Sequence, residues 1–235
     1  MSARTERLTL EVIAYIHTDF PEKFGIPRQS GLVDTRAEIV FEPEYRNPEA
    51  LRGLEGYSHI WLLWGFSETG KGKWSPTVRP PRLGGNQRMG VFATRSPFRP
   101  NPLGLSCVEL ERIEERKGTG CVLHVRGADL MDKTPIYDIK PYLPYVDSHA
   151  DAKGGFAHQV KEYGLKVEIP DEWMKIIPKE QREILLRILA QDPRPSYQED
   201  PERIYGMEYA GMNIRFRVKD NILTICEVER LDFTR

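Results

Sequence analysis

Carboxylates, lysines and tyrosines gather between residues 129 and 142, around one predicted strand. Asp138 and Lys140 are two positions apart, so on a strand both side chains lie on the same face. Tyr142 follows on that face if the strand continues through Pro141. A neighbouring acid and amine can position or deprotonate a substrate nitrogen, whereas an exposed ion pair contributes little. The spacing leaves both interpretations open.

A second informative segment contains no acidic residue. Residues 69–108 carry seven lysines and arginines without one Asp or Glu, and the net charge is −1, so the rest of the chain carries −8. Trp74, Phe92 and Phe98 are interleaved with these cations. A solvated basic face is one interpretation. We favour an anion-binding surface of the kind that recognises nucleic acid.

Prolines restrict the backbone inside this segment. Pro97, Pro100 and Pro102 alternate with Arg99 and Asn101, and each proline fixes its own φ and restricts the residue before it. This stiffness would preorganise the planar fork of Arg99 for a phosphate or carboxylate, while Asn101 can donate and accept hydrogen bonds at once. The alternative is an edge segment that proline protects from pairing.

Short runs of alternating apolar residues predict that a β-rich domain positions these side chains. Strands are expected at residues 8–16, 38–41, 57–66, 88–94, 106–115, 121–127 and 136–139. A short helix is expected to begin at Asn47-Pro48 and to end near Gly53 or Gly56. Many strands with few helices favour an antiparallel or mixed barrel. A Rossmann-type fold is unsupported, because no GxGxxG follows the first strand.

The sequence pattern changes after residue 147. Residues 147–162 are polar and weakly patterned, so we interpret them as a linker. Apolar residues one and four apart predict an amphipathic helix over 179–190. Residues 213–219 and 222–229 flank Asp220-Asn221, which indicates a two-residue hairpin. We therefore predict a β-barrel domain at 1–155 and a small α+β domain at 156–235.

Composition argues against several classes of protein. Cys107, Cys121 and Cys226 form no CxxC pair, and the five histidines form no HxH or HExxH spacing, so we expect neither a disulfide framework nor a metal site. No apolar run approaches the roughly 18 residues of a membrane span. Residues 1–9 lack the apolar core of a secretory signal. A cytoplasmic protein is expected.

Five stretches of the sequence resemble the TsaA-like or TrmO family of tRNA methyltransferases. They are residues 27–32 (PRQSGL), 51–61 (LRGLEGYSHIW), 79–106, 132–145 and 189–197 (LAQDPRPSY), which together extend over most of the chain. The resemblance implies a homodimer of mainly β, single-sheet barrels outside the Rossmann methyltransferase class, each with a small α+β C-terminal domain. It implies S-adenosylmethionine as cofactor. The implied reaction is methylation of the N6 nitrogen of threonylcarbamoyladenosine beside the tRNA anticodon.

The resemblance also implies which residues contact the cofactor. These are Pro27, Arg28, Gln29, Ser67, Glu68, Arg95, Leu105, Met131, Asp132, Lys133 and Thr134. Two positions depart from the family pattern. Lys133 stands where the turn usually has glycine, which implies strain or a rebuilt turn if φ is positive there. Ser67 stands where relatives often have histidine, so no imidazole role can be carried over.

The chemistry expected of such a site is positioning more than acid catalysis. A sulfonium methyl is already activated, and alignment of the nucleophile supplies up to roughly 7–11 kcal/mol in the best cases. We hypothesise that Asp138 or Tyr142 polarises the acceptor N–H, while Asn101 and Lys140 hold the carbamoyl and carboxylate groups. The residues expected to bind RNA phosphates are Arg82, Arg88 and Arg99.

Two rival hypotheses come from other classes of protein. One is a non-catalytic S-adenosylmethionine- or RNA-binding module of the same fold, and the departures at Lys133 and Ser67 are its best support. The other is a phosphate-ester enzyme that uses the arginine-rich segment. It ranks last, because the sequence offers no metal-ligand cluster and no nucleophile motif.

Overall fold

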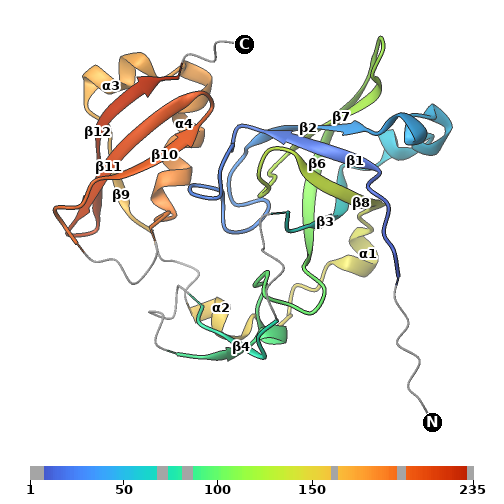
Figure 1. Ribbon diagram of the computed structural model, residues 1–235, viewed down its shortest axis with the longest axis horizontal. Coiled ribbons are helices and arrows are strands. Elements are labelled where there is room, and N and C mark those ends of the chain that lie inside the picture. The colour runs from blue at the N-terminus through green and yellow to red at the C-terminus, as the bar shows by residue number, and fades with distance from the viewer. Residues whose placement is uncertain (1–7, 68–73, 81–86, 160–163, 195–199, 232–235) are drawn as a thin grey trace.

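The computed structural model describes residues 8–67, 74–80, 87–159, 164–194 and 200–231, and Figure 1 draws the remaining residues as a grey trace. Two of the residues singled out above, Glu68 and Arg82, lie outside the described residues.

Six antiparallel strands close into a barrel, which confirms the mainly β, single-sheet prediction (Figure 1). In barrel order they are β1 (Ala14–Thr18), β2 (Arg36–Phe41), β7 (Gly120–Arg126), β6 (Leu103–Arg116), β3 (His59–Gly65) and β8 (Thr134–Pro141), which pairs back with β1. Closure leaves no unpaired edge among these strands.

Alternation of apolar residues builds the barrel core. Ile16, Ile39, Ile60 and Leu62 come from three different strands and are fully buried, and each such side chain stabilises the fold by about 1.5–3 kcal/mol. A bulge between β3 and β8 changes this alternation, because Leu63 pairs with Asp138 while its neighbour pairs with Ile136. The residue between them, Tyr137, is therefore the extra residue of the bulge.

Two strand predictions were wrong in extent. Residues 8–13 precede β1 as irregular chain and Leu8 is 85% exposed, because β2, the partner of β1, ends at Phe41 opposite Ala14. Of the strand expected at 88–94, only β5 (Met89–Gly90) forms, against β4 (Thr77–Val78). The next residues turn into a 3-10 helix, Val91–Ala93.

The helix expected at Asn47 is confirmed as a single 3-10 turn, Pro48–Leu51. The Asn47 side chain accepts a hydrogen bond from the Glu49 N–H at 3.0 Å, which satisfies a backbone group at the start of the turn. Gly53 follows with a φ of 88°, a left-handed conformation that ends the turn and that glycine adopts without strain. Two further 3-10 turns, Pro43–Tyr45 and Leu54–Gly56, flank it.

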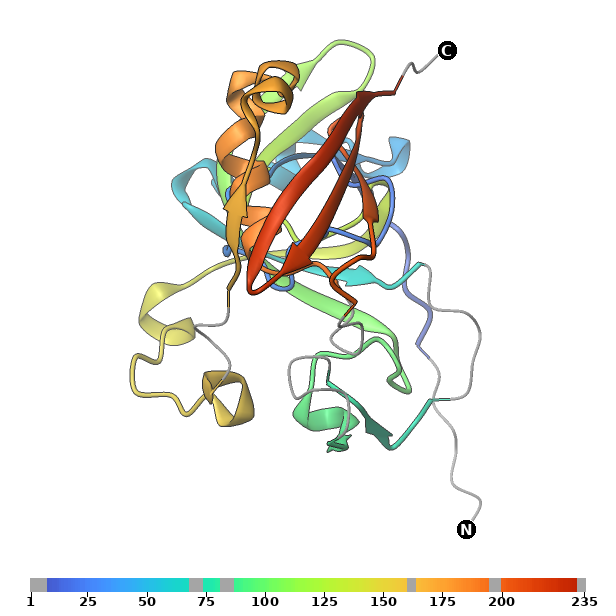
Figure 2. The same ribbon diagram turned by 90° about the vertical axis from the view of Figure 1, so that its left-hand side faces the viewer.

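A second sheet with two helices forms the C-terminal part, which confirms its α+β composition, although only the later helix and one hairpin were predicted. Its strands are, in order, β10 (Tyr205–Tyr209), β11 (Met212–Lys219), β12 (Ile222–Arg230) and β9 (Lys166–Glu168), and α3 (Asp171–Ile176) and α4 (Lys179–Ala190) pack beside them (Figures 1 and 2). The hairpin turn is also confirmed, because Asp220 and Asn221 have φ values of 51° and 60°, as a primed turn requires.

The segment interpreted as a linker is partly helical. It contains the end of α1 (Pro144–Asp147) and all of α2 (Gly155–Gln159). The Asp147 carboxylate explains α1, since it accepts hydrogen bonds from the Trp61 indole at 3.0 Å and from the Leu143 N–H at 2.9 Å. The domain boundary at residue 155 stays a prediction.

The core of the C-terminal sheet is not made by C-terminal residues alone. Phe20 and Val33, from the segment between β1 and β2, are buried in it beside residues of α4 and β11. The Phe20 ring lies 5.2 Å from that of Tyr209, and the Phe24 ring is stacked 6.3 Å from that of Phe216. Residues between β1 and β2 therefore complete the C-terminal core, which is separate from the core of the barrel.

A charged network on the outside of β2, β6 and β7 yields a pH prediction. Hydrogen bonds from Arg116, and then from His124, lower the pKa of Glu114 from 4.5 to about 2. Arg116 also lowers the pKa of Glu38. A carboxyl with a lowered pKa stabilises the fold above its unfolded pKa, and this stability is lost as pH falls through the folded pKa. Stability should therefore fall between about pH 4.5 and pH 2.

We predict that Arg116→Ala flattens this fall, because both carboxyls then titrate nearer their ordinary values. Urea unfolding followed by circular dichroism at several pH values measures it. If the wild-type and Arg116→Ala curves stay parallel between pH 4.5 and pH 2, the network does not hold these carboxylates.

Candidate functional site

A cavity of about 460 Å³ opens where β3 ends. Four of the predicted cofactor contacts line it, which are Pro27, Ser67, Met131 and Thr134. The remaining wall is largely aromatic and aliphatic and includes Trp64, Phe66, Phe98 and Leu130. Such a mostly apolar wall with a few convergent polar groups is typical of a small-molecule site.

Asp129 is a carboxylate in the cavity wall that sequence reasoning did not select. Ser106 Oγ donates to its Oδ1 at 2.6 Å, and the buried Trp64 indole donates to that Oγ at 3.0 Å. Burial raises the pKa of Asp129, while the hydrogen bond from Ser106 and the charge of Arg95 oppose this. The carboxylate is thus held in one orientation inside an apolar wall.

Gln29 and Arg95 meet close to this carboxylate. The Arg95 guanidinium donates to the side-chain oxygen of Gln29, and its charge acts on Asp129. Two predicted cofactor contacts, which lie 66 positions apart in the sequence, are therefore hydrogen-bonded to each other outside the cavity lining, and the charge of one of them acts on Asp129 in the cavity wall.

Arg28 has a different environment from its two neighbours. Its guanidinium donates to the Asp192 carbonyl at 2.6 Å, and its backbone N–H donates to the Gln191 side chain at 3.4 Å. Both acceptors follow α4 in the C-terminal part of the chain. The Arg28 side chain thus ties the cavity loop to the C-terminal domain.

The turn at residues 131–134 has a positive φ at position 133, where the family resemblance implies glycine and this chain has lysine. Lys133 has a φ of 61°, so a lysine occupies a left-handed position that favours glycine. The Lys133 N–H donates to the Ile16 carbonyl and the Asp132 N–H to the Phe20 carbonyl, each at 2.8 Å. Thr134 Oγ1 closes the turn by donating to the Met131 carbonyl at 2.7 Å. The turn keeps its hydrogen bonds despite the lysine.

The predicted acid–amine pair lies on the outside of the barrel. Lys140 Nζ is 2.8 Å from Asp138 Oδ2, and this pair holds the pKa of Lys140 above its usual range. Although β8 ends at Pro141, Tyr142 lies by the same face, with its ring 5.9 Å from that of Trp61, the strand partner of Lys140. The structure therefore brings together Asp138, Lys140 and Tyr142.

Leu105 belongs to this outer face and does not line the cavity. It is 56% exposed and pairs with Leu63, whose other strand partner is Asp138. Two groups of predicted residues thus lie apart, one in the cavity at the end of β3 and one on the outer face of β3, β6 and β8.

Tyr137 lies between these two groups, and sequence reasoning missed it. A Cβ added at Gly65, which lines the cavity, would lie only 2.5 Å from the Tyr137 hydroxyl. Gly65 therefore leaves room for this phenol beside the cavity. Tyr137 comes directly before Asp138 in the β8 bulge. Strand spacing alone does not indicate where Tyr137 lies, because the bulge that sets its position depends on pairing with β3, far away in the sequence.

The arginine-rich segment uses one of its predicted phosphate ligands internally. Arg99 donates to the carbonyls of Thr94 at 2.7 Å and Val91 at 3.2 Å, and its guanidinium lies 5.7 Å from the centre of the Phe92 ring. Arg88 is exposed and donates to Thr77 Oγ1 at 3.3 Å. Asn101 is also exposed. Arg99 thus shapes the loop, while Arg88 and Asn101 face solvent.

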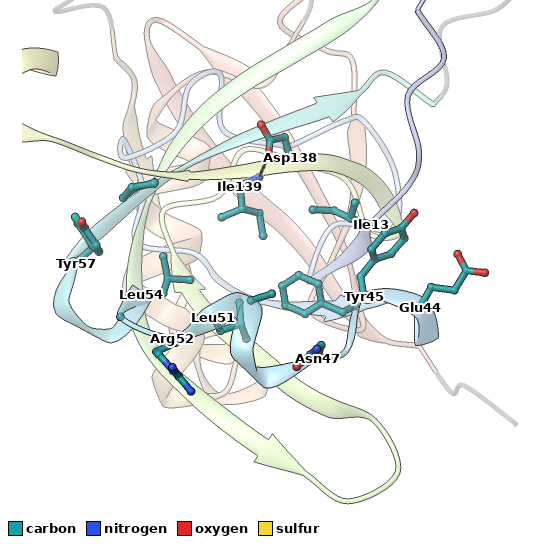
Figure 3. A pocket seen from close by; sticks show the side chains of 14 residues that line it. Ile13, Glu44, Tyr45, Asn47, Leu51, Arg52, Leu54, Tyr57, Asp138 and Ile139 are labelled. Atoms are coloured by element: carbon teal, nitrogen blue, oxygen red, sulfur yellow. Dashed lines mark hydrogen bonds between the residues drawn. The ribbon is translucent and has the colours of Figure 1, made fainter.

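A second cavity, of about 600 Å³, lies between β8 and the 3-10 turns that follow β2. In Figure 3, Leu51, Leu54 and Ile139 point toward one another, while the carboxylate of Asp138 points away from them. Asp138 accepts a hydrogen bond from the Ile139 N–H at 2.9 Å. Asp138 of the outer-face group also lines this cavity, but none of the predicted cofactor contacts does.

Two classes of feature are missing from the part of the chain that the structure describes. It holds no group of three or more His, Cys, Asp or Glu side chains that could bind a metal ion. None of its helices is long and apolar enough to cross a membrane. Fold and site together define a closed β-barrel protein with a mostly apolar pocket that contains one carboxylate.

Known proteins with the same sequence pattern identify the family. The tRNA-methyltransferase O N-terminal domain matches residues 15–148, and the TrmO C-terminal domain matches residues 162–231. The tRNA (adenine(37)-N6)-methyltransferase of Escherichia coli K12 is 43% identical over 219 residues, which cover 89% of this chain and 93% of that protein. The chain belongs to the tRNA-methyltransferase O family, as the sequence motifs indicated.

Two proteins of Pseudomonas aeruginosa add to this result. The putative S-adenosylmethionine-dependent methyltransferase RcsF is 42% identical over 213 residues, which cover 87% of this chain and 90% of that protein. The crystal structure of TrmO from that organism matches with a TM-score of 0.75 at 33% identity and covers 95% of this chain and all of that one, 100%. The similarity therefore includes both the barrel and the C-terminal domain.

The left-handed lysine yields a stability prediction. A non-glycine residue with positive φ costs roughly 1–2 kcal/mol, and the entropy that glycine loses on folding offsets part of this gain. Lys133→Gly should therefore raise the free energy of unfolding by up to about 1 kcal/mol in urea titrations. Lys117→Gly is the matched control, because this exposed lysine has no positive φ, and it should destabilise the protein. A loss of stability in Lys133→Gly would show that the lysine side chain contributes more than its backbone costs.

Proposed function

We propose that this protein transfers the methyl group of S-adenosylmethionine to the N6 nitrogen of adenine 37 in tRNA, on a base that already carries the threonylcarbamoyl group. The observation that carries the proposal is the 43% identity with the Escherichia coli tRNA (adenine(37)-N6)-methyltransferase, which extends over 93% of that protein. The named Pseudomonas relative supports the choice of cofactor.

The residues around the cavity fit this cofactor. When bound, S-adenosylmethionine supplies a methyl group on a positively charged sulfur. The Asp129 carboxylate complements a sulfonium or ammonium group, and the Arg95 guanidinium complements a carboxylate. Trp64, Phe66 and Phe98 offer aromatic surface to a purine and to a cation. We assign cofactor binding to this cavity, with Pro27, Gln29, Ser67 and the 131–134 turn around it.

On this proposal, the outer-face residues position the acceptor nitrogen. Lys140 is exposed and carries a positive charge that can meet the threonyl carboxylate, while Asp138 holds it in place at 2.8 Å. Asn101 can donate to the carbamoyl oxygen. A tyrosine hydroxyl beside the acceptor N–H would polarise that bond, and Tyr137 joins Tyr142 as a candidate because its hydroxyl lies next to Gly65 in the cavity wall.

The arginines have distinct proposed roles. Arg88 is exposed and is proposed to bind an RNA phosphate, and the same role is proposed for Arg82, outside the described residues. Arg99 is proposed to act indirectly, because three of its contacts are already made within residues 91–94. The role proposed for Arg99 is to hold the conformation of the loop at residues 91–99.

Two further parts of the proposal concern assembly and location. The outer face of β6 exposes Leu105, and α1 exposes Tyr145 and Val146 at 83% and 52%, apolar surface of the kind that subunit interfaces cover. We propose that the protein acts as a homodimer. Since its proposed substrate is tRNA, we propose the cytoplasm as its place of action.

No observation favours the non-catalytic alternative. Its best support was Lys133, and the turn there keeps the left-handed backbone and its hydrogen bonds. The serine at position 67 lines the cavity without obstructing it.

Purified protein, S-adenosylmethionine and tRNA with or without threonylcarbamoyladenosine test the function. Mass spectrometry of digested nucleosides should detect the methylated product only with the modified tRNA. Binding of the cofactor without product on either tRNA would support the non-catalytic module instead.

We predict that Asp129→Asn weakens S-adenosylmethionine binding by about tenfold, a typical loss for one charge-assisted contact. Burial raises the pKa of Asp129 above its ordinary 3.8, so the wild-type affinity should fall as pH falls through that raised pKa. The variant should lack this pH dependence. Isothermal titration calorimetry measures both, with Asp151→Asn, an exposed aspartate, as control. Equal affinities for wild type and Asp129→Asn would remove Asp129 from the site.

We predict that Asn101→Ala and Lys140→Ala each lower kcat/KM for modified tRNA by about 10²-fold or more, the scale of a lost positioned catalytic group. Cofactor affinity should survive, because both residues lie outside the cavity lining. Lys219→Ala, at an exposed lysine of β11, is the control. Full activity in both variants would refute the proposal that Asn101 and Lys140 position the acceptor.

A further inference from the structure

Three large aromatic side chains are exposed on the acid-free segment beside the cofactor cavity. Trp74 is 49% exposed, Phe92 is 72% exposed and Phe98 is 57% exposed. In Figure 1, the part of the chain around β4 projects from the barrel at the bottom of the view, away from the C-terminal sheet. Aromatic rings gathered at one such place indicate a surface that is covered when the protein works.

The backbone that carries these rings is fixed by hydrogen bonds. The Ser75 N–H donates to the Phe98 carbonyl at 3.4 Å and the Val91 N–H to the Pro76 carbonyl at 3.0 Å. These bonds join the strand that begins after Trp74 to the loop that carries Phe92 and Phe98. The three rings therefore belong to one folded unit.

Arg99 stabilises the centre of this unit. Its guanidinium lies 5.7 Å from the centre of the Phe92 ring and binds the carbonyls on both sides of that ring, those of Val91 and Thr94. The arginine thus presents Phe92 to solvent on a rigid 3-10 helix. A ring that is already held loses little entropy when a partner stacks on it.

The positive charge of the acid-free segment indicates which class of partner this surface binds. Arg79, Arg88 and Arg95 are exposed within it, and residues 69–108 contain no Asp or Glu. Cations around aromatic rings are the pattern of surfaces that bind single-stranded nucleic acid, where bases stack on the rings and phosphates meet the cations. A surface that docks an apolar protein partner does not require that acidic residues be absent around it.

The position of Phe98 connects this surface with the chemistry. Phe98 lines the cavity that we assign to the cofactor, and more than half of its surface is still open to solvent. A base stacked on its outer side would lie next to the cavity.

We propose that Trp74, Phe92 and Phe98 form a stacking platform for unpaired RNA bases that flank the target adenine. This inference rests on the proposed function for the identity of the RNA. The platform holds the bases by their faces, so it tolerates sequence, while the cavity and the outer-face residues select the modified base.

Equilibrium binding of a tRNA anticodon stem-loop tests the platform without methyl transfer. Phe92→Leu and Trp74→Leu keep apolar bulk but remove the stacking surface, and each should weaken RNA binding by about tenfold. Phe92→Tyr should retain wild-type affinity, and S-adenosylmethionine affinity should be unchanged in all three variants. Ile204→Ala is the control, because this side chain is 59% exposed in the C-terminal domain.

Salt dependence separates stacking from charge. The slope of binding affinity against salt should be the same in Phe92→Leu and the wild type, because no phosphate contact is lost, whereas Arg88→Ala should lower the slope by about one. Unchanged RNA affinity in the leucine variants would overturn the platform. So would a change of oligomeric state in light scattering, since the rings would then serve contact between copies of the chain.

The outcome is distinguishable from failure of the proposed function. If the wild-type protein binds tRNA without methylating it, and Phe92→Leu weakens that binding, the platform stands and the enzymatic proposal falls. If the wild type methylates tRNA and the leucine variants bind and react normally, the reverse holds.

Discussion

The hydrogen bonds between residues 16–20 and residues 130–133 are the constraint on which most of this structure depends. The end of β1 accepts from Lys133 at 2.8 Å, and Phe20 accepts from Asp132 at the same distance. The ring of Phe20 is buried in the C-terminal core. One short segment thus fixes the barrel end, the turn beside the cavity and the second sheet together. A left-handed lysine is tolerated in that turn because its neighbours are held on both sides.

The C-terminal domain supports the cavity from a second direction. Arg28 donates to the Asp192 carbonyl at 2.6 Å, and the adjacent Gln29 accepts from Arg95. Hydrogen bonds therefore lead from the end of α4 to Arg95, whose charge acts on the Asp129 carboxylate in the cavity wall. The structure therefore gives the C-terminal domain a local task, which is to hold the loop at residues 27–29. That task does not depend on any contact of this domain with RNA.

Local patterns predicted the elements well and the side-chain partners poorly. The strand at β3, the helix α4 and the hairpin at Asp220-Asn221 depend on neighbouring residues, so their periodicity and turn residues were enough. Asp129 and Tyr137 were missed because their positions depend on Ser106 and Gly65, which belong to other strands. Arg99 was expected at a phosphate because the sequence gives its type but not the carbonyls that it binds. The pairing of Asp138 with Lys140 was predicted, because residues two positions apart on a strand lie on the same face.

The contribution of the first domain to the C-terminal core has a consequence for how ligand binding is felt across the molecule. Gln181 of α4 donates to the Asp19 carboxylate at 3.4 Å and accepts from Tyr209, and Asp19 directly precedes the residue that holds the cavity turn. Because Phe20 and Val33 complete the C-terminal core, this domain cannot leave the barrel without exposing both. A ligand in the cavity that binds only the folded chain therefore stabilises the distant sheet as well. The two family domains divide the sequence, but residues of the first domain complete the core of the second.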